Sequence, residues 1–178
     1  MGKILNIAAI FAAGVLVQAC NTSGCTENQN SLPLAGFYSM ETRQQISIDS
    51  LGIGGVGRDS LFYGPPDRLS QAYLPFRSQF DETAYYFRYM QKALDFPEIV
   101  DTVRFTYTSQ PYFASEECGA MYRYTIRKVD YTTHLIDSVG IVDSVITNSE
   151  LERIRIYFHT SLPDDEETYS TPGKEAKP

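Results

Sequence analysis

The chain has 178 residues, with 22 acidic against 15 basic side chains and a formal net charge of −7. Such a balance argues against nucleic acid as a partner, because Lys and Arg must neutralise phosphates there, and against attachment through anionic lipid, which needs basic patches. The roughly 150 residues that follow the apolar start suffice for one domain with a buried core.

The chain begins with a basic residue, Lys3, followed by an apolar run from Ile4 to Val17. A charged start and a run of this length are typical of a secretory signal peptide, and the run is short for a membrane span. It ends in LVQAC, where the small Ala19 directly precedes Cys20. This ending resembles the lipobox of bacterial lipoproteins. The resemblance implies that residues 1–19 are removed and that Cys20 then carries a diacylglyceryl group and a further acyl chain such as palmitate. An uncleaved anchor, or a buried apolar helix with an incidental cysteine, is the alternative.

The other two of the three cysteines, Cys25 and Cys118, form a pair once Cys20 carries lipid. The compartment outside the inner membrane is oxidising, so we expect them to form a disulfide. The bond would close a loop of roughly 90 residues and contribute about 4 kcal/mol on the chain-entropy model. Two separate thiols, or a thiol bonded to another protein, remain the alternative.

The two ends of the mature chain have polar compositions. Residues 20–34 predict a flexible, lipidated tether, and residues 161–178 predict a disordered acidic tail with almost no apolar side chains. The DDEE run in the tail is more typical of a solvated segment than of a metal site. The folded domain is therefore expected over residues 35–160.

Apolar and polar residues alternate with a period of two in this domain, most clearly over 83–90, 101–109, 121–129 and 152–158. The same pattern, rich in β-branched and aromatic residues, marks half-buried strands. Shorter candidates are QQISIDS, DSLFYG, SQAYLPF, PYFASEE, THLIDSV and VDSVIT, and the one helix-like stretch is around MQKALDF. The spacing predicts a single all-β domain, either an antiparallel β-sandwich of immunoglobulin-like or jelly-roll-like kind or a small barrel.

Gly52 to Gly57 formally match the G-x-G-x-x-G pattern of dinucleotide sites. Such a site needs a helix that opens at the last glycine, and the following RDSLFYGPP leaves no room for one. We expect a mobile loop between strands instead. His134 and His159 have no potential metal ligand at a suitable spacing, and a G-x-S-x-G nucleophile elbow is absent. The sequence therefore predicts no metal, no cofactor and no catalytic residue.

Five arginines fall on the outward side of predicted strands, and neighbouring strands would join them into a positive stripe for carboxylates, phosphates or an acidic partner. Pairing with Asp and Glu across the sheet is the alternative. The five are Arg104, Arg123, Arg127, Arg153 and Arg155.

A triplet of Asp, Ser or Thr, and an aliphatic residue occurs five times. Its structural interpretation is a turn in which Asp or Ser bonds the local backbone before a strand begins. The triplet also resembles the O-glycosylation acceptor of exported Bacteroidetes proteins, which implies sugar on its hydroxyl groups. These hydroxyls belong to Ser50, Ser60, Thr102, Ser138 and Ser144.

Four stretches, LVQAC, LPLAGFY, ISIDSLGIGGVGRDSLFYG and DTVRFTYTSQPYFASEECG, together resemble an uncharacterised family of Bacteroidetes lipoproteins, a domain of unknown function. The resemblance implies an envelope lipoprotein, fits the pairing of Cys25 with Cys118, and supplies no activity. Lipoproteins exported to the surface in that phylum carry acidic residues after the lipidated cysteine, whereas the residues at 21–24 are neutral. We therefore expect an anchor in the outer membrane that faces the periplasm.

Two functional hypotheses follow. The first is a non-enzymatic binding or scaffolding accessory, with the membrane and another envelope protein as partners. The second is a membrane-tethered hydrolase or carbohydrate-processing enzyme, whose paired carboxylates would come from Asp81, Glu82, Glu116 and Glu117. A pocket with two carboxylates about 5–10 Å apart would favour the enzyme.

Overall fold

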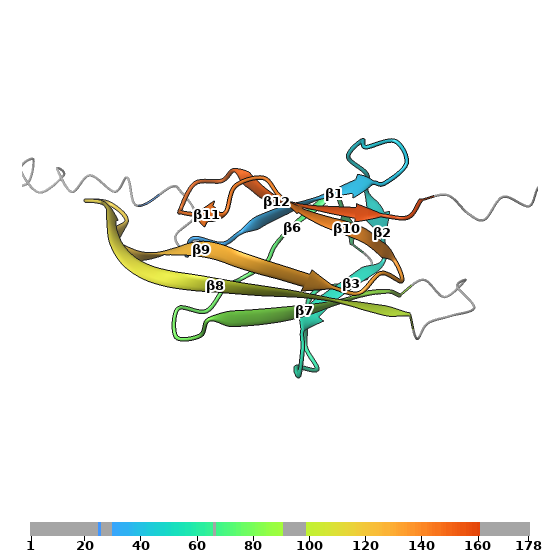
Figure 1. Ribbon diagram of the computed structural model, residues 1–178, viewed down its shortest axis with the longest axis horizontal. Helices are drawn as coiled ribbons and strands as arrows, with labels where there is room; N and C mark the ends of the chain where they lie inside the picture. The colour runs from blue at the N-terminus through green and yellow to red at the C-terminus, as the bar shows by residue number, and fades with distance from the viewer. Residues whose placement is uncertain (1–24, 26–29, 66, 91–98, 161–178) are drawn as a thin grey trace, which may run out of the picture.

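The computed structural model describes residues 25, 30–65, 67–90 and 99–160. These described residues form twelve strands and no helix, which confirms the all-β prediction (Figure 1). The strands are β1 (Leu34–Ser39), β2 (Ile48–Asp49), β3 (Leu51–Gly55), β4 (Leu61–Tyr63), β5 (Arg68–Leu69), β6 (Gln71–Tyr73), β7 (Glu82–Tyr89), β8 (Val100–Ser115), β9 (Gly119–Tyr131), β10 (Ile136–Ile141), β11 (Val145–Ile146) and β12 (Glu152–Phe158).

Two sheets pack face to face as the layers of a sandwich (Figure 1). The smaller sheet has the strand order β10-β12-β1-β6, the larger has the order β11-β9-β8-β7-β3-β4, and β2 pairs with β5 in a separate ribbon. Neighbouring strands are antiparallel, as predicted, except that β1 and β12 pair in parallel. Parallel strands need a crossover connection, and here the chain from β2 to β11 forms that connection.

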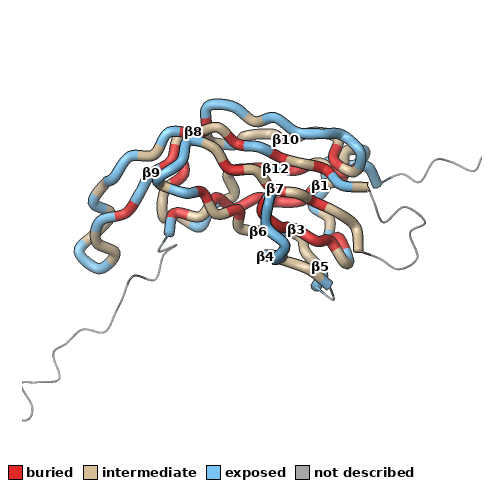
Figure 2. The backbone as a smooth tube through the Cα atoms, turned by 90° about the horizontal axis from the view of Figure 1, so that it is seen from below, coloured by how far each residue is buried: buried red, intermediate tan, exposed pale blue. Residues whose placement is uncertain are grey.

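The long hairpin of β8 and β9 extends beyond the rest of the sandwich at one end of the molecule (Figures 1 and 2). The larger sheet curls there, and the residues near the hairpin turn are largely exposed (Figure 2). Strand β12 ends at the opposite end of the molecule (Figure 1).

The core lies between the sheets and is rich in aromatic rings. Val103, Phe105 and Tyr107 of β8 are at most 1% exposed, which confirms their predicted inward orientation. Phe76 stacks on the Tyr107 ring at 4.3 Å and meets the Tyr124 ring edge to face. Such aromatic pairs contribute about 0.5–1.5 kcal/mol beyond the burial of their surface.

The glycine-rich segment Gly52–Gly57 is not the mobile loop that its composition predicts. Leu51–Gly55 is a strand in the larger sheet, and Ile53 is fully buried in the core. On the opposite side of this strand, the Tyr86 side chain lies over Gly54, where a Cβ atom would come within 2.4 Å of the tyrosine hydroxyl. The glycine therefore makes room for a cross-strand aromatic ring that protects the backbone.

The structure departs from the predicted segments at several boundaries. The first strand, β1, was not predicted, and PYFASEE is partly the continuation of β8 rather than a strand of its own. Ser31 and Leu34, which were expected in the flexible tether, are buried, so the folded domain begins before residue 35. The signal peptide, Cys20, most of the predicted tether, the helix-like stretch after Met90 and the tail 161–178 lie outside the described residues.

Candidate functional site

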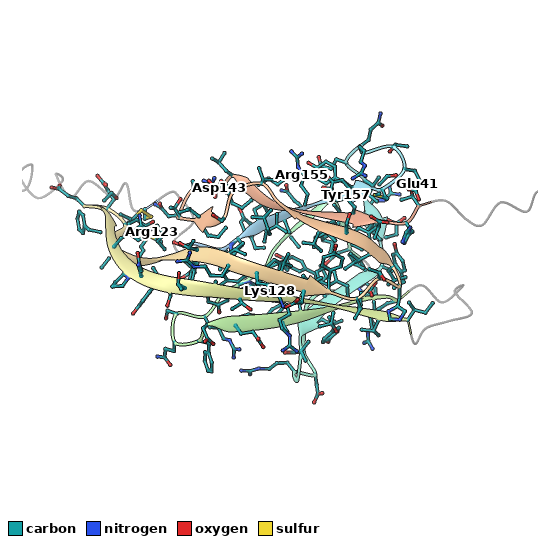
Figure 3. All side chains as sticks on the ribbon, viewed as in Figure 1. Glu41, Arg123, Lys128, Asp143, Arg155 and Tyr157 are labelled. Carbon is teal, nitrogen blue, oxygen red and sulfur yellow. A yellow bond between two sulfur atoms is a disulfide. The ribbon has the colours of Figure 1, made fainter. Side chains whose placement is uncertain are left out.

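Cys25 forms the predicted disulfide with Cys118, with Cα atoms 4.7 Å apart and 93 residues of sequence separation. Cys118 lies in the turn between β8 and β9, where its N–H donates to Ser115 Oγ at 3.0 Å. The disulfide sits next to the end of this hairpin in Figure 3. The bond therefore holds Cys25 at the tip of the longest hairpin.

The five predicted arginines are divided between the two sheets. Arg104, Arg123 and Arg127 lie on β8 and β9 of the larger sheet, whereas Arg153 and Arg155 lie on β12 of the smaller one. Figure 3 shows Arg123 near the hairpin end and Arg155 on the other layer. Because the outer faces of a sandwich point in opposite directions, these side chains do not form one stripe.

Four of these arginines also contact neighbouring polar groups, as the alternative interpretation expects. Three bind carboxylates and one binds an amide: Arg104 with Glu82 at 3.0 Å, Arg155 with Glu152 at 2.7 Å, Arg153 with Asp143, and Arg123 with Gln110 at 3.3 Å. The exposed pairs of Arg104 and Arg155 contribute about 0–1 kcal/mol each, whereas the Arg153 side chain is only 17% exposed.

Arg104 nevertheless belongs to a cluster that the sequence did not predict. It lines a pocket of about 470 Å³ together with Arg58 and Arg77. Glu82 contributes the one carboxylate in the lining, and Phe62 and Tyr85 supply aromatic surface. We call this site the basic pocket. Its volume falls within the roughly 300–1,000 Å³ of small-molecule sites.

A tight turn between β3 and β4 positions Arg58. The Arg58 N–H donates to the Gly55 carbonyl at 3.0 Å, and Gly57 adopts a positive φ of 78°. Glycine favours this backbone conformation because it has no Cβ atom. Gly55 also lies against the Arg58 and Phe62 side chains, with a Cβ position 3.5 Å from Arg58 Cγ.

A buried hydroxyl fixes the backbone at Arg77. The Tyr107 hydroxyl accepts the Arg77 N–H at 3.0 Å and lies 2.7 Å from the Thr83 hydroxyl. Outside the core, the Arg77 guanidinium stacks on the Phe80 ring at 4.0 Å and reaches the Glu82 carbonyl at 3.5 Å. The core therefore holds the backbone while the charged group stays at the surface.

Tyr85 forms the buried floor of the basic pocket. Its ring meets Phe62 edge to face at 6.1 Å, and its hydroxyl donates to the Pro75 carbonyl. Burial raises the pKa of Tyr85, so the floor stays uncharged. Three guanidinium groups, one carboxylate and an aromatic floor together suit a carboxylate or phosphate carried on a partly apolar body.

Arg58 and Arg77 were missed because neither follows the strand alternation on which the prediction relied. Their local signal is an arginine close to an exposed phenylalanine, in RDSLF and in FRSQF. A second pocket, of about 720 Å³, adjoins the first through Pro75 and Arg77. Its lining extends to Phe80 and to Tyr122 of β9 and contains no carboxylate.

Asp101 and His134 form a structural cluster. The Asp101 side chain is fully buried and accepts the backbone N–H groups of His134, Leu135 and Ile136 together with the Thr132 hydroxyl. Burial raises the pKa of Asp101, but these hydrogen bonds outweigh burial and hold it below its ordinary value. The His134 ring, 3.0 Å from this carboxylate, is 60% exposed.

The five triplet hydroxyls lie in different surroundings. Ser60 is exposed and lines the basic pocket, whereas the others are partly buried: Ser50, Thr102, Ser138 and Ser144. Thr102 lies within β8, where its N–H donates to Thr132 Oγ1 at 2.9 Å. The turn interpretation is confirmed at Asp143, which accepts the Val145 N–H at 2.9 Å.

The candidate catalytic carboxylates do not line a common pocket. Of three pockets that the described residues form, the basic pocket contains Glu82, a third contains Asp81, and the largest contains none. Glu116 and Glu117 lie in the β8–β9 turn. Within the described ranges, no three His, Cys, Asp or Glu side chains group together in a way that could hold a metal ion.

The chain resembles known sequences at the level of a protein family. No curated protein and no solved structure matches the chain. Among the residues with described structure, no helix is long and apolar enough to cross a membrane. One family model matches residues 50–158, from the residue after β2 to the last residue of β12. The chain belongs to this family of unknown function (DUF6452).

Proposed function

We propose that this protein is a non-enzymatic lipoprotein of the bacterial cell envelope that binds an anionic group in its basic pocket. The support for the anchor is the sequence LVQAC behind a basic start and an apolar run. Acyl chains on Cys20 would hold the domain on the outer membrane, since each buried methylene contributes about 0.8 kcal/mol. The neutral residues at 21–24 favour the periplasmic side.

The observation that carries the binding role is the convergence of Arg58, Arg77 and Arg104 around one concave surface of an acidic protein. They come from a hairpin turn, a connecting segment and a central strand. Guanidinium groups bind carboxylates and phosphates through paired hydrogen bonds. The ligand would be an acidic side chain of another envelope protein, or a small carboxylate or phosphate ester.

The carboxylates proposed for an enzyme support this preference for binding over catalysis. Glu82 already pairs with Arg104 at 3.0 Å. A hydrolase of the two-carboxylate type needs a second acid in the same pocket, and the described lining of the basic pocket supplies one carboxylate.

Calorimetric titration of the detergent-extracted, full-length protein would test the pocket. The probes are hexyl phosphate, hexanoate and uncharged hexanol, which share one apolar tail. We expect the two anions to bind and hexanol to fail. Arg58→Gln should weaken binding about tenfold, which is about 1.4 kcal/mol. Arg127→Gln, an exposed arginine outside the pocket lining, is the matched control and should change nothing. Equal losses in both variants would contradict the proposal.

Fractionation of cells that express wild type or Cys20→Ala would test the anchor. Wild type should incorporate labelled palmitate and sediment with outer membranes, and Cys20→Ala should do neither. Membrane recovery that is the same for both forms would refute lipidation as the means of attachment.

A further inference from the structure

One face of the β8–β9 hairpin is apolar and exposed. Its members come from two cross-strand pairs, Pro111 with Tyr122 and Phe113 with Ala120. Because the pairs lie two residues apart, all four side chains share one face of the hairpin. All four are exposed, Phe113 by 68% and Tyr122 by 44%. We call this surface the tip face.

The disulfide places the tip face close to the predicted lipid anchor. Cys25 is bonded to Cys118 and lies five positions after Cys20, with four residues between them. Five steps of fully extended chain span at most about 18 Å. Phe113 pairs with Ala120, two residues beyond Cys118, which is about 7 Å along a strand. The hairpin tip therefore cannot move far from the acylated residue.

We propose that the tip face lies against the bilayer, with Phe113 and Tyr122 in the headgroup region, so that the domain has a fixed orientation on the membrane. This inference rests on the proposed acylation of Cys20. Tyr122 suits this interface because its ring is apolar and its hydroxyl can face water, and Phe113 adds apolar surface that can be buried there. The polar headgroup layer is roughly 5–8 Å thick on each side of the hydrocarbon, so the short tether brings the tip within its reach.

The charges near the tip indicate which lipid it contacts. Glu116 and Glu117 in the turn are exposed and outnumber Arg123, which is exposed nearby on β9, so the charges near the tip repel an anionic membrane surface on balance. Contact therefore depends on apolar burial and favours zwitterionic lipid. The opposite face of the hairpin is occupied, since the Tyr112 hydroxyl donates to Asn148 Oδ1 at 3.0 Å.

Fluorescence quenching would test this orientation, because the chain contains no tryptophan and a single one can be introduced. Phe113→Trp supplies a reporter on the tip face. Phe62→Trp is the matched control, since Phe62 is 50% exposed but lies on β4 beside the basic pocket. Both acylated, full-length variants are reconstituted into phosphatidylcholine vesicles with and without brominated lipid, and flotation reports anchoring separately.

We expect both variants to float and the tryptophan at position 113 to be quenched several-fold more than that at position 62. Adding Cys25→Ser and Cys118→Ser should reduce the quenching and leave flotation unchanged, because the tether then lengthens. Flotation without preferential quenching at position 113 would overturn this inference and leave the proposed anchor intact. Failure of both variants to float would overturn the anchor and the orientation together.

Discussion

Replacing Asp101 by alanine should destabilise the domain more than any other single loss of a carboxylate among the described residues. The Asp101 side chain is fully buried and accepts four hydrogen bonds from the segment that leads into β10. Three come from the backbone N–H groups of His134, Leu135 and Ile136, at 2.5–2.9 Å, and the fourth comes from the Thr132 hydroxyl. It therefore joins the start of β8 to the start of β10, and so the larger sheet to the smaller one.

The magnitude follows from the groups that would lose their partner. A hydrogen bond to a charged acceptor contributes about 1.5–3 kcal/mol, and each buried donor left unsatisfied costs about 1–3 kcal/mol. The Ile136 N–H is buried, whereas the His134 N–H lies in an exposed residue where water can replace the carboxylate. We therefore expect Asp101→Ala to lower the free energy of unfolding by about 3–5 kcal/mol. Asp101→Asn, which keeps one acceptor oxygen, should cost roughly half as much.

Urea unfolding followed by far-ultraviolet circular dichroism would measure both variants, with Asp130→Ala as the matched control. Asp130 is exposed and pairs with Lys128 at 2.6 Å, so its loss should cost about 0–1 kcal/mol. If Asp101→Ala were no more destabilising than Asp130→Ala, the buried carboxylate would not hold the segment before β10, and the reasoning would fail.

The same carboxylate predicts the response to acid. Its pKa in the folded state lies below the ordinary 3.8. Its contribution is therefore fully present above that value and is lost as the pH falls through the lower, folded-state pKa. The wild-type free energy of unfolding should fall steeply below about pH 4, and the Asp101→Ala curve should be flatter there. Parallel curves for the two proteins would contradict this assignment.

Two further predictions concern the disulfide and the Tyr107 hydroxyl. Cys118→Ser opens a loop with a sequence separation of 93 and should lower the free energy of unfolding by roughly 3–5 kcal/mol on the chain-entropy model. Urea unfolding of reduced wild type should show the same loss. A smaller change in both would mean that the disulfide adds little stability. Tyr107→Phe removes the bonds to Thr83 and Arg77 and should cost about 1–3 kcal/mol while weakening hexyl phosphate binding. Tyr131→Phe, on an exposed tyrosine, should change neither quantity.

The local pattern predicted the strands that alternate over many residues and missed those held by distant partners. β12 was predicted with its observed bounds, because ERIRIYF places Ile154, Ile156 and Phe158 in the core. β1 was missed because LAGFYS has no polar side on which alternation depends. Its strand conformation comes from hydrogen bonds to β12 and β6 on its two sides, and β12 lies more than 100 residues away along the chain.

The glycine-rich strand was missed for a related reason. Glycine in a strand interior is unfavourable on its own, because it loses backbone entropy and packs no side chain. In β3 the cost at Gly54 is offset by the Tyr86 ring, which comes from the neighbouring strand β7 of the same sheet. A window of sequence around residue 54 contains no information about residue 86, so composition alone pointed to a loop.

The basic pocket shows why a site is harder to predict than a strand. Alternation correctly placed Arg104 on the outward side of β8, since the face of a strand residue is a local property. Which arginines meet is set by strand order, and β12 with its two arginines lies in the other sheet. Arg104 instead lines one pocket with Arg58, which lies in a turn, and Arg77, which lies in a connecting segment. Their positions depend on a glycine with positive φ and on a buried tyrosine hydroxyl. The charge of the site therefore comes from surface residues, but its geometry comes from the core and the turns beneath them.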